Sequence, residues 1–246
     1  MSRPGTGRRI DIRRSQIYDG GRAVAPFAWR LIHANYADRG VLLAGTDVAG
    51  WEDVVGNRDM VQADTTKDPL YGLFTSQRAL VFDDANDFMA SPSVSLSAYS
   101  QITIAFAAAW TATGTGILWS SSIDPTSNAG AFYVFENGAT YIVNYRNAAA
   151  NVQRTAAISA GVHRFIFVLD VAGASAIPTL YVDGVSSGSA PAAANVALGN
   201  YVHYLGMFGG TSLPWSGKMG DSLIYGDALS VAEIAAVDAF LASRCT

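Results

Sequence analysis

The sequence has 246 residues, of which half are apolar and only 15% are charged, and its formal net charge is −4. This length suffices for one large β domain or two small domains, and the weakly acidic total gives no sign of a nucleic-acid-binding protein. A single cysteine, Cys245, excludes an internal disulfide, and no stretch is apolar for long enough to predict a transmembrane helix.

The N-terminal region is basic, whereas the rest of the chain is acidic. Residues 1–39 contain eight Arg and three Asp, and the remainder has a net charge of −9. We therefore predict a basic arm over residues 1–20 and one sandwich domain over residues 21–246. Such an arm indicates docking on a partner, and a solvated, disordered terminus is the alternative. The candidate anchoring residues are Arg8, Arg9, Arg13 and Arg14.

The arm also contains "RIDIR", in which Ile10 and Ile12 alternate with charged residues. This pattern predicts a segment that could add a strand to the edge of a neighbouring sheet. The stretch "MSRPGTGRRIDIRR" lacks the apolar run of a signal peptide. We accordingly expect synthesis in a cytoplasm without export through the general secretory route.

Strand patterns recur from residue 27 onward, with turn residues between them and no helical period. The pair "AFYVFENGATYIVNY" (131–145) has Asn137-Gly138 between two aromatic-rich strands, which is a strong hairpin signal. Alternation with short gaps predicts an all-β antiparallel jelly-roll sandwich. The predicted inward-facing residues are Ile102, Ile104, Phe106, Phe165, Phe167, Leu180 and Val182.

One helix is expected, over residues 229–245. Ser230 and Glu233 have the spacing of a capping box. An apolar stripe through Ile234, Val237 and Phe240 should face the sandwich, and Arg244 is expected in the last turn, where a cation suits the helix dipole.

Several segments resemble a known family. The stretches "HRFIFVLD…TLYVDG" and "WSGKMGDSLIYGDALSVAEI" are similar to the laminin-G-like, concanavalin-A-like jelly roll. "WEDVVGNRDMVQADTTKDPLY" (51–71) resembles the opening of such domains in bacteriophage structural proteins, with Val55 in place of the usual Ser. In "LVFDDANDFM", Asp84 stands where the family has Gly. The resemblance covers residues 41–246 and implies this fold, in which Asp183-Gly184 makes a tight turn.

Hydrolases exist in this family, but their arrangement of acids is missing here. Glycoside hydrolysis needs two carboxylates that face one sugar. The chain has three Glu, at 52, 136 and 233, and no two acids alternate on an apolar strand. "GVSSG" (184–188) matches a nucleophile motif by letters, but it precedes a loop rather than a helix. We therefore expect no catalytic residue.

Two binding sites can be proposed from residue types. Exposed aromatics that could stack on a sugar are Trp215 with Tyr201 or Tyr204, although one face of that strand must be core. Asp83, Asp84 and Asp87 could hold Ca²⁺ through oxygen ligands, with turn formation as the alternative; no other cofactor is expected.

The combined expectation is a non-enzymatic structural protein of a phage-like virion, as a head decoration, fibre or tail component. Its partners would be other virion proteins and further copies of itself, without nucleic acid or membrane. The alternative is a glycan-binding module for adsorption to host surface polysaccharide, and a glycoside hydrolase is a third hypothesis.

Overall fold

The computed structural model of the protein describes residues 25–111, 113–173, 175–187, 193–194 and 196–245. The predicted arm, its four anchoring Arg residues and the domain boundary at residue 20 lie outside this range. Within the described residues, no helix combines the length and the hydropathy that crossing a bilayer requires.

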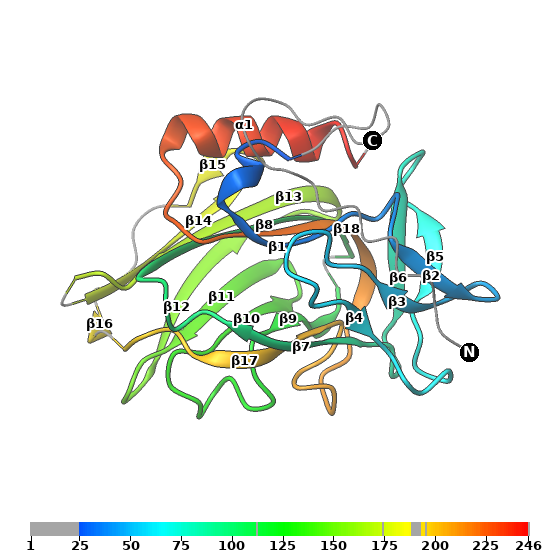
Figure 1. Ribbon diagram of the computed structural model, residues 1–246, viewed down its shortest axis with the longest axis horizontal. Coiled ribbons are helices and arrows are strands. Elements are labelled where there is room, and N and C mark those ends of the chain that lie inside the picture. The colour runs from blue at the N-terminus through cyan, green and yellow to red at the C-terminus, as the bar shows by residue number, and fades with distance from the viewer. Residues whose placement is uncertain (1–24, 112, 174, 188–192, 195, 246) are drawn as a thin grey trace.

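The chain folds into two antiparallel sheets that lie face to face (Figure 1). In the first sheet, strand β18 pairs with β8 on one side and with β1 and β6 on the other, and β13, β14 and β15 follow β8. These strands are β1 (Leu31–Asn35), β6 (Arg78–Asp83), β8 (Gln101–Trp110), β13 (Gly161–Asp170), β14 (Ser175–Val182), β15 (Val185–Ser186) and β18 (Ser216–Tyr225). The short β16 (Ala193–Ala194) pairs with the start of β14.

The second sheet has the order β12-β11-β10-β9-β17-β7-β4. Its strands are β4 (Met60–Val61), β7 (Met89–Ser95), β9 (Thr115–Ser120), β10 (Phe132–Asn137), β11 (Thr140–Arg146), β12 (Asn151–Ala157) and β17 (Asn200–Leu205). Three further strands connect the two sheets at one end, namely β2 (Val41–Ala44), β3 (Asp47–Trp51) and β5 (Leu70–Leu73). Here β3 pairs with β2, β4 and β5, and β5 pairs with β6.

The main core lies between the two sheets and contains most of the large aromatic residues. Phe106, Phe165 and Tyr141 stack on one another, with ring centroids 5.3 Å and 4.2 Å apart. Of the seven predicted inward-facing residues, six are at most 1% exposed, and Val182 is partly buried against the same core. The predicted antiparallel sandwich is therefore confirmed, because both sheets direct their alternating apolar residues to one interior.

Helix α1 (Val231–Ala242) covers the outer face of the first sheet (Figure 1). The predicted capping box is present, since the Ser230 side chain accepts from the Glu233 backbone N–H and the Glu233 side chain accepts from the Ser230 N–H. The expected stripe is also buried, and it packs with Ala105 and Leu223 of the sheet in a second core. The buried residues of α1 are Ile234, Val237, Phe240 and Leu241.

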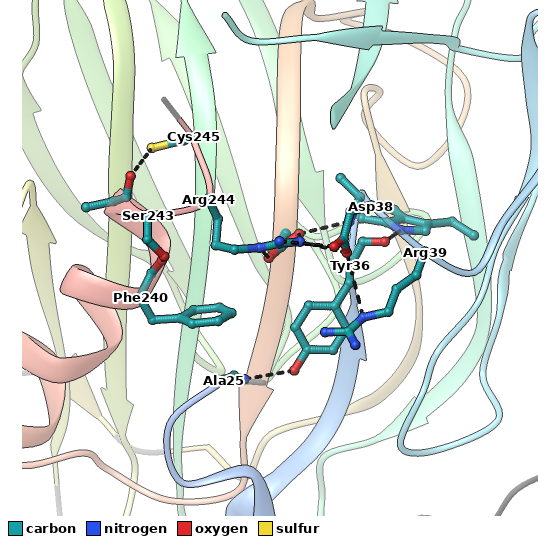
Figure 2. Close-up of polar contacts among 12 residues, drawn as sticks. Ala25, Tyr36, Asp38, Arg39, Phe240, Ser243, Arg244 and Cys245 are labelled. Atoms are coloured by element: carbon teal, nitrogen blue, oxygen red, sulfur yellow. Dashed lines mark hydrogen bonds and ion pairs between the residues drawn. The ribbon is translucent and has the colours of Figure 1, made fainter. Parts of the chain in front are cut away.

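Arg244 does not lie in the last helical turn, as the sequence led us to expect, but beyond the end of the helix. Its guanidinium bonds to the carboxylate of Asp221 at 2.7 Å and to Asp38 at 2.7 Å. Figure 2 shows this arginine reaching from the helix end toward the segment of Tyr36, Asp38 and Arg39. Burial raises the pKa of Asp221 even though Arg244 opposes that effect. The C-terminus is thus tied to the first sheet by a buried ion pair.

The Asp183-Gly184 pair makes the predicted turn. Val182 is opposite Val185 in the ladder, and both turn residues have positive φ, 51° and 77°. Two consecutive positive φ angles define a type I′ turn, which Asp and Gly tolerate. The Asp183 carboxylate also accepts from the Arg164 backbone N–H at 3.0 Å and contacts the His163 ring at 2.6 Å. Its role is structural in each of these contacts.

The segment that resembles phage proteins, residues 51–71, builds the framework of the connecting strands. Trp51 is fully buried, and its ring N–H donates to the Tyr36 carbonyl. Buried Asp53 accepts from the backbone N–H groups of Ala34, Val55 and Arg58. Burial would raise the pKa of Asp53, but the hydrogen bond and charge of His33, together with backbone donors, hold it well below its usual range. These contacts indicate that these two residues of the segment stabilise the fold rather than bind a ligand.

Candidate functional site

The structure removes Trp215 from the candidate sugar site. Trp215 is 1% exposed, and its ring packs 5.5 Å from the ring of Phe82. Its Nε1–H donates to Oε2 of Glu136 at 2.8 Å inside the core. The prediction that Trp215 forms an exposed stacking platform is wrong, because Glu136 points inward from β10 and supplies the buried partner that an indole N–H needs.

Tyr201 and Tyr204 fall on opposite faces of β17, as alternation requires. Tyr201 is opposite Val94, a core residue, and its hydroxyl donates to the Ala129 carbonyl at 2.8 Å. Fully buried His203 lies on the same side. Tyr204 instead lies on the outer face of the second sheet, half-buried, with its ring 6.4 Å from that of Phe88. Of the three predicted ring residues, Tyr204 alone keeps the expected position on an accessible face.

The strand register places Tyr204 in a row of directly opposed residues that crosses the second sheet. Tyr204 is opposite Ala90 on one side and Ser120 on the other, Ser120 is opposite Tyr133, and Tyr133 is opposite Asn144. Asn144 is in turn opposite Gln153 on the last strand. Directly opposed residues point to the same face of a sheet. We call this set the outer row: Ala90, Tyr204, Ser120, Tyr133, Asn144 and Gln153.

Aromatic rings flank the outer row. Tyr133 makes an edge contact with Phe208 at 6.0 Å, and Phe135 lies half-buried two residues further along β10. The loop after β17 packs here, since a Cβ at Gly210 would come within 3.2 Å of the Tyr204 ring and 3.1 Å of Phe88. This part of the surface therefore presents several rings, while Ser120 between the two tyrosines is buried and bonded to Met207 and Gly209 of that loop.

The two tyrosine hydroxyls of the outer row are free to bind a ligand. Within the described part of the chain, neither the Tyr133 nor the Tyr204 hydroxyl forms a hydrogen bond. Burial raises the pKa of both residues, so both hydroxyls remain protonated donors at neutral pH. Such an arrangement suits a polyhydroxylated ligand, because rings can cover apolar sugar faces while hydroxyl and amide groups form hydrogen bonds.

Sequence reasoning missed Tyr133 and Phe135, although a signal was present. In "FYVFEN", the inward residues Phe132 and Val134 alternate with the outward residues Tyr133 and Phe135. The segment was interpreted as a hairpin and its outward aromatics were not counted. Alternation of rings along one strand predicts that the outer face carries aromatic side chains as well as the inner face.

A pocket of about 490 Å³ lies at the rim between β12, β13 and the β14–β15 turn. Its polar lining residues are Thr155, Ser159, His163, Asp183, Ser186 and Ser187. The His163 ring contacts Asp183 through Nδ1 and the Ser159 carbonyl through Nε2, at 2.6 Å and 3.0 Å. Both ring nitrogens are therefore occupied by contacts to Asp183 and Ser159. The pocket therefore lacks the base that the "GVSSG" motif would require.

The three aspartates proposed for Ca²⁺ are not brought together as a metal site. Asp83 accepts from the backbone N–H groups of Ala85 and Asn86, and Asp84 has a left-handed backbone with φ of 66°. Asp87 is buried, and burial, followed by the charge of Asp83, raises its pKa to about 7. Among the described residues, no group of three acidic, His or Cys side chains has the arrangement of a metal site. Turn formation, the alternative to Ca²⁺ binding, explains the presence of Asp83 and Asp84 here.

Solved structures with similar folds belong to larger proteins. The chain matches the binding domain of botulinum neurotoxin serotype D with a TM-score of 0.65 and 10% identity, over 86% of this chain and 52% of that one. The receptor-binding domain of botulinum neurotoxin type G gives 0.55 and 9%, over 86% and 51%. A Trypanosoma rangeli sialidase gives 0.58 and 16%, over 90% and 34%.

The chain thus spans about half of each toxin chain and about a third of the sialidase chain. At these identities, the similarity concerns the fold alone. No curated protein sequence matches the chain. A family model does match residues 83–235, which is more than half of the chain. The sandwich, its terminal helix and this match agree, and the chain belongs to the concanavalin A-like lectin/glucanases superfamily.

Proposed function

We propose that this protein is a non-catalytic carbohydrate-binding domain and that the outer row is its binding face. The observation that carries the proposal is the pair of half-buried tyrosines, Tyr133 and Tyr204, joined through Ser120 in one register row and lacking hydroxyl partners in the described protein. Neighbouring rings and the exposed Gln153 amide complete a surface with apolar and polar groups. The similar folds in toxin receptor-binding domains and in a sialidase support a role in recognition.

The positions of the three glutamates support binding without hydrolysis. Glu136 is buried and holds Trp215 and Thr111, and Glu233 is part of the helix cap. Glu52 is exposed in the segment that follows β3. Retaining hydrolysis needs two carboxylates about 5 Å apart on one sugar-binding surface. The outer row itself contains no carboxylate, so a glycan on this face would be bound and released unchanged.

Glycan arrays followed by calorimetry with purified protein test the proposal. Tyr204→Ala and Tyr133→Ala should each weaken binding at least tenfold, because each removes a ring and a hydroxyl from the face. Tyr99→Ala is the matched control: Tyr99 is also half-buried, but it packs near Gly226 at the end of the first sheet. Binding that survives both row variants, with folding confirmed by thermal melting, contradicts the assignment. Release of reducing ends from the bound glycan contradicts the non-catalytic role.

A second part of the proposal is display on a phage-like particle, as a head or tail component, in contact with other virion proteins and further copies of itself. It is favoured by the resemblance of residues 51–71 to phage structural domains and by the basic segment before the acidic body. Deleting residues 2–20 should leave the sandwich folded but absent from purified particles, as judged by mass spectrometry of those particles. Normal incorporation of the truncated chain would place the anchor elsewhere, and residues 21–40 would then be the next candidate.

A further inference from the structure

The strands that connect the two sheets carry an unusual amount of exposed apolar surface. Five large apolar side chains there are between 40% and 58% exposed, on β2, β4 and β5. They are Leu42, Leu43, Val61, Leu70 and Leu73. The strand pairing places Leu42, Val61 and Leu70 on one face, and exposed apolar residues that share a face indicate an interaction surface.

Part of this surface is continuous with the outer face of the second sheet, which no described helix covers and which we call the bare face. Leu42 is opposite Gly50, Gly50 is opposite Val61, and Val61 is opposite Ala90 of the outer row. One step along the strands, Ala44 is opposite Asp47 and Asp47 is opposite Leu70. We call these two rows, with the free edge of β2, the β2 patch.

Strand β2 is an unprotected sheet edge. Among the described strands it pairs with β3 alone, so its other side offers unpaired N–H and C=O groups. Its sequence is Val-Leu-Leu-Ala, with none of the Lys or Pro residues that usually discourage pairing at an edge. An edge of this kind is suited to accept an added strand.

Unbalanced negative charge lies beside the β2 patch. Asp68 is 6% exposed, and neither of its carboxylate oxygens has a hydrogen-bond partner in the described protein. Burial and the charges of Asp47 and Asp64 raise the pKa of Asp68, and the charges of Asp83, Asp47 and Asp68 act in the same direction on Asp87. The nearby Lys67 pairs with Asp64 at 3.3 Å. A buried carboxylate without a partner is costly, and a cation held at the surface beside Asp47 and Asp64 would lower that cost through its charge.

We propose that the β2 patch binds residues 8–14 of a second copy of this chain as an added strand. The segment "RRIDIRR" supplies two Ile residues at strand spacing and four Arg residues. Apolar side chains would cover the exposed Leu42 and Leu70, while the guanidinium groups would pair with the accessible carboxylates of Asp47 and Asp64. Direct pairing of two β2 edges is disfavoured, because it would bring two aspartate clusters together.

The fold favours a second copy over the chain's own arm. Ala25, the first described residue, is buried with the cluster beneath α1, on the helix-covered side of the sandwich. The Leu42–Gly50–Val61 row instead continues into the outer row on the bare side. An arm that docked on its own patch would have to cross from the helix-covered side to this other side, whereas docking on a neighbour sets no such requirement.

Complementation between two variants of the full chain tests this assignment. Leu42→Lys damages the patch at a side chain that is 58% exposed, and Ile10→Asp/Ile12→Asp damages the arm. Sedimentation velocity should show an associated wild type, and each variant alone should dissociate at least tenfold more readily. An equimolar mixture should form one-to-one dimers, because each partner keeps one intact half of the interface. Val231→Lys, at a side chain that is 72% exposed on the helix, is the control and should associate like wild type.

Three results would overturn the proposal: a wild type that stays monomeric at high concentration, variants that associate normally, or a mixture that fails to associate. Raising the salt concentration should also weaken wild-type association, since Arg–Asp attraction is screened. The outcome is separable from the proposed glycan binding, because neither variant changes a residue of the outer row.

Discussion

The two sheets of the sandwich share one core but have different outer faces. The outer face of the first sheet packs under α1 through Ala105, Ile166 and Leu223. The outer face of the second sheet has no helix over it among the described elements (Figure 1). It presents half-buried rings such as Tyr133 and Tyr204. One face is closed by the helix and contributes stability, while the other keeps accessible rings, as the proposed glycan site requires.

The burial patterns of individual strands reflect this difference. Eight residues of β8 are buried, because Ile104 and Phe106 face the core while Ala105 and Ala107 lie under neighbouring elements. Small residues on the outer side let a helix approach closely. Strand β10 instead alternates between buried and half-buried residues and places Tyr133 and Phe135 outward. Large rings on the outer side indicate a face that no helix covers.

The largest expected effect concerns the ion pair that fixes the end of the helix on the closed face. Arg244→Met leaves Asp221, which is 2% exposed, without its guanidinium partner. Removing one member of a buried pair costs about 3–5 kcal/mol, measured by urea unfolding at pH 7. The double variant Asp221→Asn/Arg244→Met should recover much of that loss. A single-variant loss below about 1 kcal/mol would contradict the role of the pair.

A matched pair of truncations measures the two faces directly. Phe240→Ala should lower the free energy of unfolding by about 3–4 kcal/mol, because this ring is 9% exposed and packs edge-on against Tyr36. Phe135→Ala on the bare face should cost less than half as much, since its ring is half-buried. Equal losses in chemical denaturation would mean that the two faces do not differ as described.

Much of the fold could be predicted from the sequence, because the signals are local. The capping box at Ser230, the turn at Asp183-Gly184 and the alternation in β8 and β13 depend on residues close in the chain. The position of Arg244 could not be predicted, since its partners Asp38 and Asp221 are 206 and 23 residues away.

The candidate site was predicted in part, for a similar reason. Alternation placed Tyr204 and His203 on opposite faces of β17, but it could not show which ring residues of other strands lie beside Tyr204. The row from Tyr204 to Tyr133 depends on the register of β17, β9 and β10. Trp215 was misassigned because its buried partner, Glu136, is 79 residues away. Strand order and register are set by tertiary packing, and a single sequence does not contain them in local form.

The free energy of unfolding should depend on pH through His203, which lies on the core side of the second sheet. Burial, followed by the charges of His33 and Arg58, lowers the pKa of His203 to about 3, and neither ring nitrogen has a partner among the described residues. The unfolded chain therefore binds more protons between about pH 6.5 and pH 3, so stability is lost as the pH falls through that window.

Between pH 7 and pH 4, this loss amounts to about 3 kcal/mol at most. His203→Phe keeps the ring contacts with Trp119 and Phe132 and should remove that part of the acid sensitivity. Unfolding free energies measured by urea titration at several pH values check this. If the curves of wild type and variant run parallel, His203 is not the titrating group.

The smallest expected effect on stability comes from the hydroxyl groups of the bare face. Tyr133→Phe and Tyr204→Phe remove groups that have no partner in the described protein, so the free energy of unfolding should change by less than about 0.5 kcal/mol. Tyr145→Phe is the contrast, because its hydroxyl donates to the Val196 carbonyl, and its loss should cost about 1 kcal/mol. Glycan affinity should respond in the opposite order, falling several-fold for the two bare-face variants and staying unchanged for Tyr145→Phe. A bare-face variant that is destabilised but binds normally would show that these hydroxyls serve the fold, and the separation between a closed, stabilising face and an open, binding face would then fail at its most direct test.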